Sequence, residues 1–481
     1  MTFTKALTKE TEFLHIIKTS VTDIRFWLFV FFLIRLETID LPPLDEHAWR
    51  QCITLGVAKS YLEVDSNFLE PKTVICDSRE GILAQEFPIL NYIIFLLWKL
   101  FGINNWTFRI FNLSVASFGL YYFYRLVSRL FDKYVGFAST IVFGVSVAFM
   151  YARKAMPDVF AVSLCIIGME YGYRYLECKT LKNILLFTFF LSLGLLSKMP
   201  AAVILPFGLF LFSFRKDQIR SNIVLLIGGS TALTFMILWY FVWVKWAEDA
   251  YHFPLFYPTT LKEGYAQLLA MKADFILRFY PIALTGNISF ITCIVGLLAA
   301  VYTKNTKILA IIGLSIIILV FFMLKSGGVF AGHTYYIIPF VPAMSLLAGY
   351  GIALLKKYQW FFYTFLLLLS TEAIVKHKSD FFIPSEDKKY LRLVEISDKC
   401  IPAKSRILVN GGNGQPRMMY FANRRGWTVD DRMKDTSWVN GESTVGLHYM
   451  IIDKSKWQDS ISYKVLYDDP YYRVYKVIND E

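Results

Sequence analysis

The stretch "NIVLLIGGSTALTFMILWYFVWV", Asn222–Val244, decides the class of fold. It has 23 residues and no charged side chain, and about 20 consecutive apolar residues are enough to cross the hydrocarbon core of a bilayer. Similar runs occur at Tyr134–Ala152 and Ile308–Leu324. The whole chain of 481 residues is 56% hydrophobic and 17% aromatic, which is too apolar for a soluble domain of this length. We therefore predict an all-α polytopic membrane protein.

Eleven membrane-spanning helices are expected. Their approximate ranges are 24–39, 106–124, 135–153, 158–175, 183–197, 200–214, 222–244, 283–302, 308–324, 334–355 and 359–375. Alternate loops between them are basic, which is typical of loops on the cytoplasmic side. This pattern places a tail at 1–23 inside the cell and the C-terminal segment outside. The net charge of +12 then reflects membrane topology, and no nucleic-acid partner is expected.

The run "PILNYIIFLLWKLF" at 88–101 is short and begins at a proline, so we expect an interfacial or re-entrant helix. It belongs to a long first outer loop at 40–105, and a second outer loop is expected at 245–281. Both loops lie within a membrane domain at 24–375. Cys52 and Cys76 share the first loop and could form a disulfide there.

Composition changes after the last predicted span. Four short β-type runs, "RILVNGG", "HYMIIDK", "YKVLYDD" and "YRVYKV", are separated by polar turns, and one helix is expected around 416–422. We predict a small α/β domain at 376–481 on the outer side of the membrane.

The polar stretch "LPPLDEHAWRQ", Leu41–Gln51, follows the first predicted span. One interpretation is structural: Asp45 caps a new helix, and Glu46 forms a surface pair with Arg50. The other interpretation is catalytic, because ionisable residues at helix mouths are candidates for function. For Glu86, in "AQEFPIL", the structural alternative is a cap of the 88–101 helix.

Several cations lie in short outer turns, where lysine and arginine are disfavoured. They are Arg153 and Lys154 in "ARKAMPD", Lys198 in "LLSKMPA" and Lys325 in "KSGGVFAGHTYYIIP". We expect an anionic group to compensate them. The structural alternatives are snorkelling for Lys198, an N-cap role for Asp158, and an aromatic belt for His333, Tyr335 and Tyr336.

Acids and a cationic patch on one side of a membrane suggest a reaction class. If a sugar is linked through phosphate to a membrane lipid, the leaving phosphate needs lysine, arginine or histidine donors. A carboxylate can deprotonate the acceptor as general base, and one-step displacement proceeds with inversion. A second acid would help to hold the acceptor or a metal ion.

Five motifs in order, "DEHAWRQ", "EFPILNY…KLFG", "ARKAMPD", "LLSKMPA" and "GHTYYIIPFVP", resemble the membrane glycosyltransferases of the GT-C class. The resemblance is to the group of protein O-mannosyltransferases and lipid A aminoarabinose transferases, in particular to uncharacterised bacterial members. It covers residues 24–355.

The resemblance implies that Asp45 is the base, with Glu46 beside it and Asp158 in a second acidic motif. It also implies that Lys198, His333 and Tyr336 lie near the donor phosphate. We add candidates on the same outer side, which are Arg50, Arg153 and Tyr335 as further phosphate ligands and His47 and Glu86 as acceptor or loop-supporting residues.

The chain departs from the family pattern in two places. Arg50 comes later after the acidic pair than the corresponding arginine of the aminoarabinose enzymes, and a histidine, His333, replaces the lysine or arginine of some relatives. These differences leave the sugar and the acceptor open.

We thus predict an inverting glycosyltransferase with a polyprenyl-phosphate sugar as donor and a lipid, protein or glycan as acceptor. It should act at the outer face of a bacterial cytoplasmic membrane. The sequence requires no cofactor, although Asp45, Glu46 and Asp158 could hold a divalent metal ion. The rival functions are a transporter or flippase of lipid-linked sugars, which would need polar groups near the middle of the bilayer, and a non-catalytic assembly factor.

Overall fold

The structure is a computed structural model that describes residues 19–212, 216–252, 258–412, 414–457 and 461–477. Most of the predicted tail at 1–23 and part of the loop at 245–281 lie outside these residues. The chain divides into two compact units. The first unit comprises Met1–Ile39, Arg109–Leu238 and Pro258–Phe381, and the second comprises Asp40–Phe108, Trp239–Tyr257 and Phe382–Glu481.

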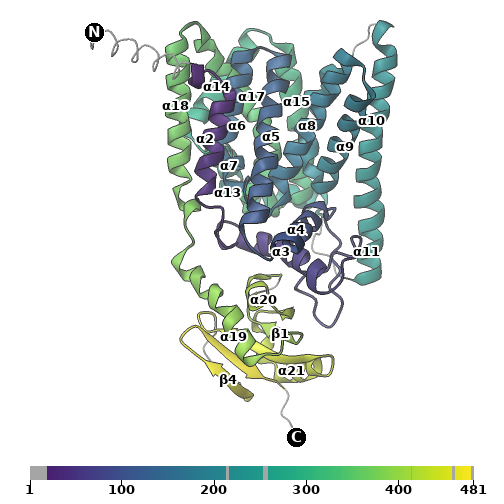
Figure 1. Cartoon of the computed structure of the whole chain (residues 1–481), viewed down its shortest axis with the longest axis vertical. Coiled ribbons are helices and arrows are strands. Elements are labelled where there is room, and N and C mark those ends of the chain that lie inside the picture. The colour runs from purple at the N-terminus through teal and green to yellow at the C-terminus, as the bar shows by residue number, and fades with distance from the viewer. Residues whose placement is uncertain (1–18, 213–215, 253–257, 413, 458–460, 478–481) are drawn as a thin grey trace, which may run out of the picture. The chain divides into compact units, whose positions relative to one another are not determined.

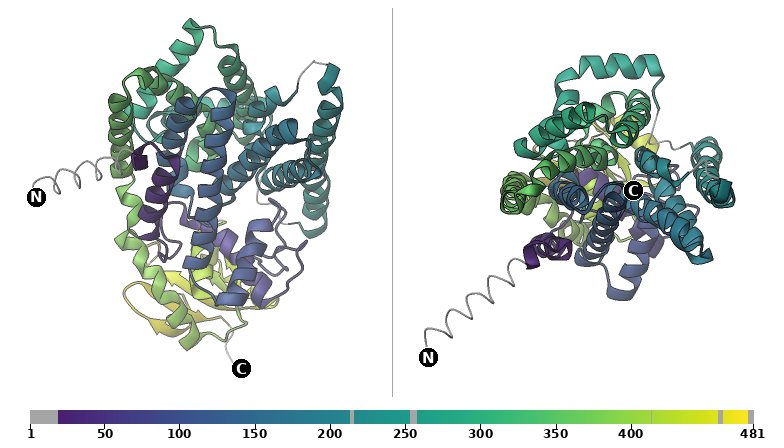
Figure 2. Two further views of the ribbon diagram at one scale, coloured as in Figure 1. Left: turned by 45° about the horizontal axis from the view of Figure 1, so that its top comes forward. Right: turned by 90° about the horizontal axis from the view of Figure 1, so that it is seen from above.

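The first unit is helical, and its long helices lie side by side (Figures 1 and 2). Its α-helices are α2 (Ile24–Leu36), α5 (Trp106–Leu130), α6 (Lys133–Val145), α7 (Val147–Tyr151), α8 (Pro157–Cys178), α9 (Leu181–Ser197), α10 (Ile219–Ile237), α12 (Leu261–Ala270), α13 (Lys272–Leu277), α14 (Asn287–Tyr302), α15 (Thr306–Ser326), α16 (Gly328–Gly332), α17 (Val341–Ala353) and α18 (Gln359–Lys376). Tighter 3-10 segments are η1 (Met199–Leu211), η2 (Lys216–Gln218), η5 (Thr334–Phe340), η6 (Leu354–Lys357) and η7 (Lys378–Phe381), and η4 (Arg278–Ala283) is a π-helix.

Local sequence explains where several helices begin and how closely they pack. The Asp132 carboxylate accepts hydrogen bonds from the backbone N–H groups of Tyr134 and Val135 and so caps α6. Helix α17 packs against α6 and α14. A Cβ at Gly296 would lie 1.8 Å from the Leu347 carbonyl oxygen, so only glycine permits this approach of α14 to α17.

Three helices in the described part of the chain are long and apolar enough to cross a membrane: Ile219–Tyr251, Thr306–Ser326 and Thr334–Lys357. A further candidate is the pair Lys272–Ala283 and Asn287–Tyr302, which is bent by 96°. Each of the eleven predicted ranges falls largely on a helical segment, so their helical nature is confirmed. The number of spans and their direction stay predictions.

The second unit contains α3 (Ala48–Glu63), α4 (Ile89–Phe101) and the predicted C-terminal domain. From Trp239 onward, the continuation of α10 also belongs to this unit; it consists of η3 (Leu238–Trp243) and α11 (Val244–Tyr251). The C-terminal part has η8 (Ser385–Arg392), α19 (Leu393–Cys400), β1 (Arg406–Val409), α20 (Arg417–Ala422), β2 (Arg425–Thr428), η9 (Asp431–Lys434), α21 (Thr436–Ser443), β3 (Leu447–Asp453), β4 (Lys464–Asp468) and β5 (Tyr472–Lys476).

The five strands form one sheet in the order β2-β1-β3-β5-β4. Strands β2, β1 and β3 are parallel, whereas β5 is antiparallel to both β3 and β4. The α/β character, the helix at 416–422 and the helix within 88–101 are confirmed. Strand β2 was not predicted, because its sequence "RGWT" has no alternation of apolar residues.

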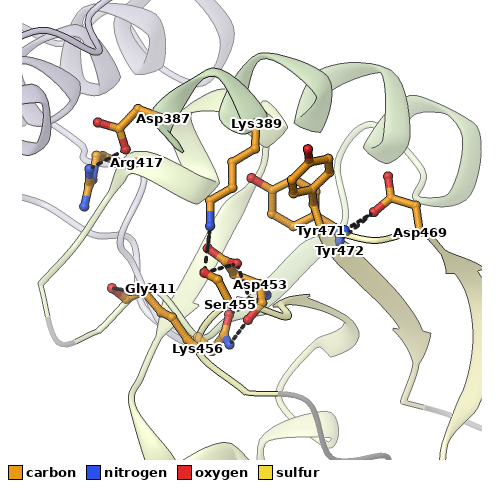
Figure 3. A network of polar contacts seen from close by, with 11 residues as sticks. Asp387, Lys389, Gly411, Arg417, Asp453, Ser455, Lys456, Asp469, Tyr471 and Tyr472 are labelled. Atoms are coloured by element: carbon orange, nitrogen blue, oxygen red, sulfur yellow. Dashed lines mark hydrogen bonds and ion pairs between the residues drawn. The ribbon is translucent and has the colours of Figure 1, made fainter. Parts of the chain in front are cut away.

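A polar network fastens η8 to the end of β3 (Figure 3). The Lys389 ammonium lies 2.6 Å from a carboxylate oxygen of Asp453 and 2.8 Å from the Ser455 hydroxyl. Lys456 donates to the Gly411 carbonyl oxygen at 2.7 Å. Because Asp453 is fully buried, this charge pair fixes the position of η8 on the sheet.

Cys52 and Cys76 both belong to this unit and are buried free thiols. The disulfide that their shared loop suggested is not formed.

Candidate active site

The predicted site residues fall into two groups, and each group lies within one compact unit. The acidic loop group, in the second unit, comprises Asp45, Glu46, His47, Arg50 and Glu86. In the first unit, Asp158, Lys198, His333, Tyr335 and Tyr336 form what we call the Lys198 group, and Arg153 lies elsewhere in that unit.

Asp45 is held at the beginning of α3 and is only 3% exposed. The side-chain amide of Gln51 donates a hydrogen bond to its carboxylate at 2.7 Å. The N-cap position of α3 is His47, and it makes no side-chain capping bond. The helix-cap interpretation of Asp45 is therefore wrong, and the carboxylate is instead a buried, oriented acceptor.

Arg50 and Glu86 connect the start of α3 to the segment before α4. One guanidinium nitrogen of Arg50 lies 2.9 Å from both carboxylate oxygens of Glu86, and the other donates to the Thr54 hydroxyl at 3.2 Å. Helix α4 begins after Pro88 with no side-chain cap, so Glu86 is not its capping residue. The pair links the first turn of α3 to the segment before α4.

His47 has an unusual backbone conformation between the acidic pair and α3. Its φ of 56° and ψ of 41° lie in the left-handed region, which few non-glycine residues occupy. Its imidazole lies 3.5 Å from the Glu46 carboxylate, and the Glu46 side chain is 50% exposed. Such strain commonly persists where a loop must present particular side chains. Here the exposed carboxylate of the pair is Glu46.

The Lys198 group is built at the ends of α8 and α9. Lys198 follows the last residue of α9 and its ammonium lies 3.8 Å from a carboxylate oxygen of Asp158. Asp158 lies in the first turn of α8, where the helix N-terminus favours a negative charge. Both residues are buried, so Lys198 does not snorkel. The N-cap of α8 is Met156, so the N-cap interpretation of Asp158 is also wrong.

Two tyrosines of η5 complete this group. The Lys198 ammonium lies 5.9 Å from the ring centre of Tyr335 and 5.7 Å from that of Tyr336. The His333 ring lies 5.4 Å from Tyr335 and 5.9 Å from Tyr336. Tyr335 is 2% exposed, which excludes a membrane-interface belt for that residue. The group thus places a cation, an acid and two phenol groups together.

Arg153 belongs to a different group, the Asp380 cluster, which comprises Arg35, Arg153, Lys154 and Asp380. The Asp380 carboxylate lies 3.0 Å from Arg35, 3.0 Å from Arg153 and 2.9 Å from Lys154. The three cations are fully buried. The anion that compensates Arg153 and Lys154 is therefore a carboxylate of the chain itself. Sequence reasoning missed Asp380, although it follows the last predicted span closely.

The surroundings of the candidate metal ligands Asp45, Glu46 and Asp158 do not support a metal site. Among the described residues, no three or more histidine, cysteine, aspartate or glutamate side chains are grouped so that they could hold a metal ion. Asp45 accepts a hydrogen bond from the Gln51 amide, and Asp158 faces the Lys198 ammonium.

Comparison with known proteins agrees with this architecture. The family described as dolichyl-phosphate-mannose-protein mannosyltransferase matches residues 85–241. Crystal structures of ArnT from Cupriavidus metallidurans, in the apo state and bound to undecaprenyl phosphate, each cover 94% of this chain and 98% of their own at a TM-score of 0.58, with 12% and 10% identity. The chain has the fold of the GT-C glycosyltransferases.

Two further proteins are similar to this chain. The oligosaccharyltransferase of Archaeoglobus fulgidus, in complex with zinc and sulfate, matches 89% of this chain and 67% of its own at 11% identity and a TM-score of 0.54. An uncharacterized protein of Aquifex aeolicus (strain VF5) is 25% identical over 304 residues, which are 60% of this chain and 57% of that protein. The matched family region contains Glu86, Asp158 and Lys198, whereas Asp45 lies before it.

Proposed function

We propose that this protein is an inverting membrane glycosyltransferase. It transfers a hexosyl or pentosyl group from a polyprenyl-phosphate donor to a lipid, protein or glycan acceptor at the outer face of a bacterial cytoplasmic membrane. The observation that carries the proposal is the Lys198 group. It holds a buried cation beside two tyrosines in a fold of which one solved example has undecaprenyl phosphate bound.

Asp45 acts as the base. The acceptor hydroxyl or amine attacks the anomeric carbon, and its proton passes to the Asp45 carboxylate as the new bond forms. The bond between the anomeric carbon and the phosphate oxygen breaks, and the phosphate leaves with the electron pair. The Gln51 amide donates to one Asp45 oxygen at 2.7 Å and so orients the carboxylate.

Lys198 stabilises the charge that develops on the leaving phosphate, which is the step where electrostatic stabilisation contributes most. Tyr335, Tyr336 and His333 add hydrogen-bond donors around the same phosphate. Asp158 orients the Lys198 ammonium, and Glu46 binds the acceptor from the exposed side of the loop. Arg50 and Glu86 hold the loop that carries Asp45.

The test is transfer of radiolabelled sugar from short-chain polyprenyl-phosphate donors to a membrane extract by purified protein in lipid. Asp45→Asn should lower the rate by about 10³-fold, the range typical of a lost general base. Asp40→Asn is the matched control, since Asp40 is an exposed acid of the same loop. Equal activity of Asp45→Asn and wild type would remove Asp45 from the mechanism. Movement of intact donor across the bilayer without its consumption would favour a flippase.

A further inference from the structure

The first loop extends the C-terminal sheet, and both belong to the second unit. Residues 74–77 lie beside β2, and Ile75 forms a parallel bridge with Gly426. The Gly426 N–H donates to the Val74 carbonyl at 3.1 Å, and the Cys76 N–H donates to the Gly426 carbonyl at 2.9 Å. The otherwise open edge of β2 is therefore paired with the loop.

Two arginines of the sheet hold carbonyl groups of the same loop. Arg425, on β2, donates to the Thr73 carbonyl at 3.3 Å and also to the Glu80 carbonyl. Arg406, on β1, donates to the Asp77 carbonyl at 3.1 Å. Hydrogen bonds from charged donors are stronger than neutral ones, so these side chains reinforce the backbone pairing.

The paired edge requires glycine at position 426. Gly426 has a φ of +149°, and a Cβ there would lie 2.0 Å from the Ile407 carbonyl oxygen of β1. No other residue fits between β1 and the loop without displacing the strand.

Apolar packing joins the loop to the sheet at the residue before the proposed base. Leu44 is 1% exposed and belongs to one buried cluster with Val74 and Ile75 of the loop. The cluster continues into α19 and the sheet through residues that include Leu393 and Ile407. Leu44 therefore lies in the apolar core of the C-terminal part, and Asp45 follows it directly.

We infer that the C-terminal sheet positions the Asp45 carboxylate for catalysis, with Leu44 and Arg425 as positioning residues. Asp45 is held from two directions, by the burial of Leu44 on its N-terminal side and by the Gln51 amide on its C-terminal side. A general base works only within hydrogen-bond reach of the proton that it abstracts. A displacement of about 1 Å is enough to cost roughly 10²-fold in rate.

This inference rests on the proposed function, so its test has one readout that needs no activity. Cys76 is buried beside Gly426, and burial raises the pKa of its thiol. It should therefore react slowly with a maleimide for as long as the loop stays on the sheet. Variants with Cys76 as the single cysteine report loosening of the loop as an increased rate of modification.

The experiment uses the full chain in lipid and compares Leu44→Ala and Arg425→Met with wild type. Leu44→Met, which keeps the apolar volume, is the conservative rescue. Arg473→Met is the matched control, since Arg473 pairs with Asp468 within the sheet. We expect Leu44→Ala to lower kcat about 100-fold with the donor KM within about twofold of wild type. Arg425→Met should lower kcat about tenfold and accelerate Cys76 modification, because two bonds to the loop are lost.

Rescue by Leu44→Met and wild-type behaviour of Arg473→Met complete the expected pattern. If Leu44→Ala does not fold, the kcat and the Cys76 modification rate of Arg425→Met decide whether the inference holds. The inference is overturned if Cys76 becomes reactive while kcat stays within twofold of wild type. It is also overturned if Cys76 stays protected in Arg425→Met. An inactive wild type would refute the proposed function, and the thiol readout would still decide whether the sheet holds the loop.

Discussion

Replacement of Lys198 by methionine separates the structural contribution of the Lys198–Asp158 pair from its catalytic one. The two charges lie 3.8 Å apart, so their attraction is about 4 kcal/mol at an effective dielectric constant of about 20. The positive end of the α8 dipole still stabilises the remaining Asp158 carboxylate, which offsets up to about 1 kcal/mol of this loss. Lys198→Met should therefore lower the free energy of unfolding by about 3 kcal/mol, as expected for one broken buried pair.

The double variant Lys198→Met with Asp158→Asn removes both charges together. Because neither buried group is then left charged, most of the lost stability should return. Binding of polyprenyl phosphate should not return, since the cation proposed to contact the phosphate is absent. Stability is measured by detergent-induced unfolding with tryptophan fluorescence, and binding is measured with radiolabelled undecaprenyl phosphate in lipid. Recovery of phosphate binding in the double variant would refute the proposed role of Lys198, and equal stability of all three proteins would refute the charge pairing.

Three further predictions concern the Asp380 cluster, the topology and acid stability. Asp380→Asn should abolish most folded, monodisperse protein in size-exclusion chromatography, because three buried cations lose their carboxylate at a cost of roughly 3–5 kcal/mol or more; a normal elution profile would contradict this. The C-terminal segment, with Cys400, is predicted to lie outside the cell. In right-side-out spheroplasts, an impermeant maleimide should therefore label a single-cysteine variant at Cys400 but not one at Cys178. The reverse pattern would contradict the predicted topology. Hydrogen bonds from Arg473 hold the carboxyl pKa of Asp468 below its ordinary value. This contribution to stability is present above the unfolded pKa of about 3.9 and is lost as pH falls through the folded pKa. Asp468→Asn should therefore weaken the fall of the unfolding temperature with decreasing pH in the acid range. An unchanged pH dependence would argue against the hydrogen bond.

The apolar runs predicted the helical part of the fold well, because the bilayer requires long uncharged segments with internally satisfied backbone groups. In the predicted range 200–214, the described helix is the 3-10 segment η1 (Met199–Leu211), which contains Pro206. Composition does not distinguish a 3-10 segment from an α-helix. Strand β2 was missed because its four residues, which include an arginine and a glycine, do not form a recognisable β-type run. Their extended conformation depends on pairing with β1 and with the loop.

The sequence motifs indicated candidate site residues, but they did not indicate which side chains contact one another. The turn "ARKAMPD" indicated cations that needed an anion, and the local sequence could not show that Asp380, more than 200 residues later, supplies it. Likewise, the pattern "DEHAWRQ" did not indicate that the Gln51 amide would donate to the Asp45 carboxylate. Pairings between residues far apart in the chain depend on how the helices pack. No local motif in a single sequence indicates them.

The central claim is that a lipid phosphate leaves as the sugar is transferred with inversion. The most direct measurement is ³¹P and ¹H NMR of the purified protein in lipid with a polyprenyl-phosphate sugar of defined anomeric form and an acceptor extract. We predict that the phosphodiester signal is replaced by that of polyprenyl phosphate and that the product carries the opposite anomeric configuration. Retention of configuration would contradict a single displacement with Asp45 as base, and an unchanged phosphodiester signal across the donor series would contradict the proposed reaction itself.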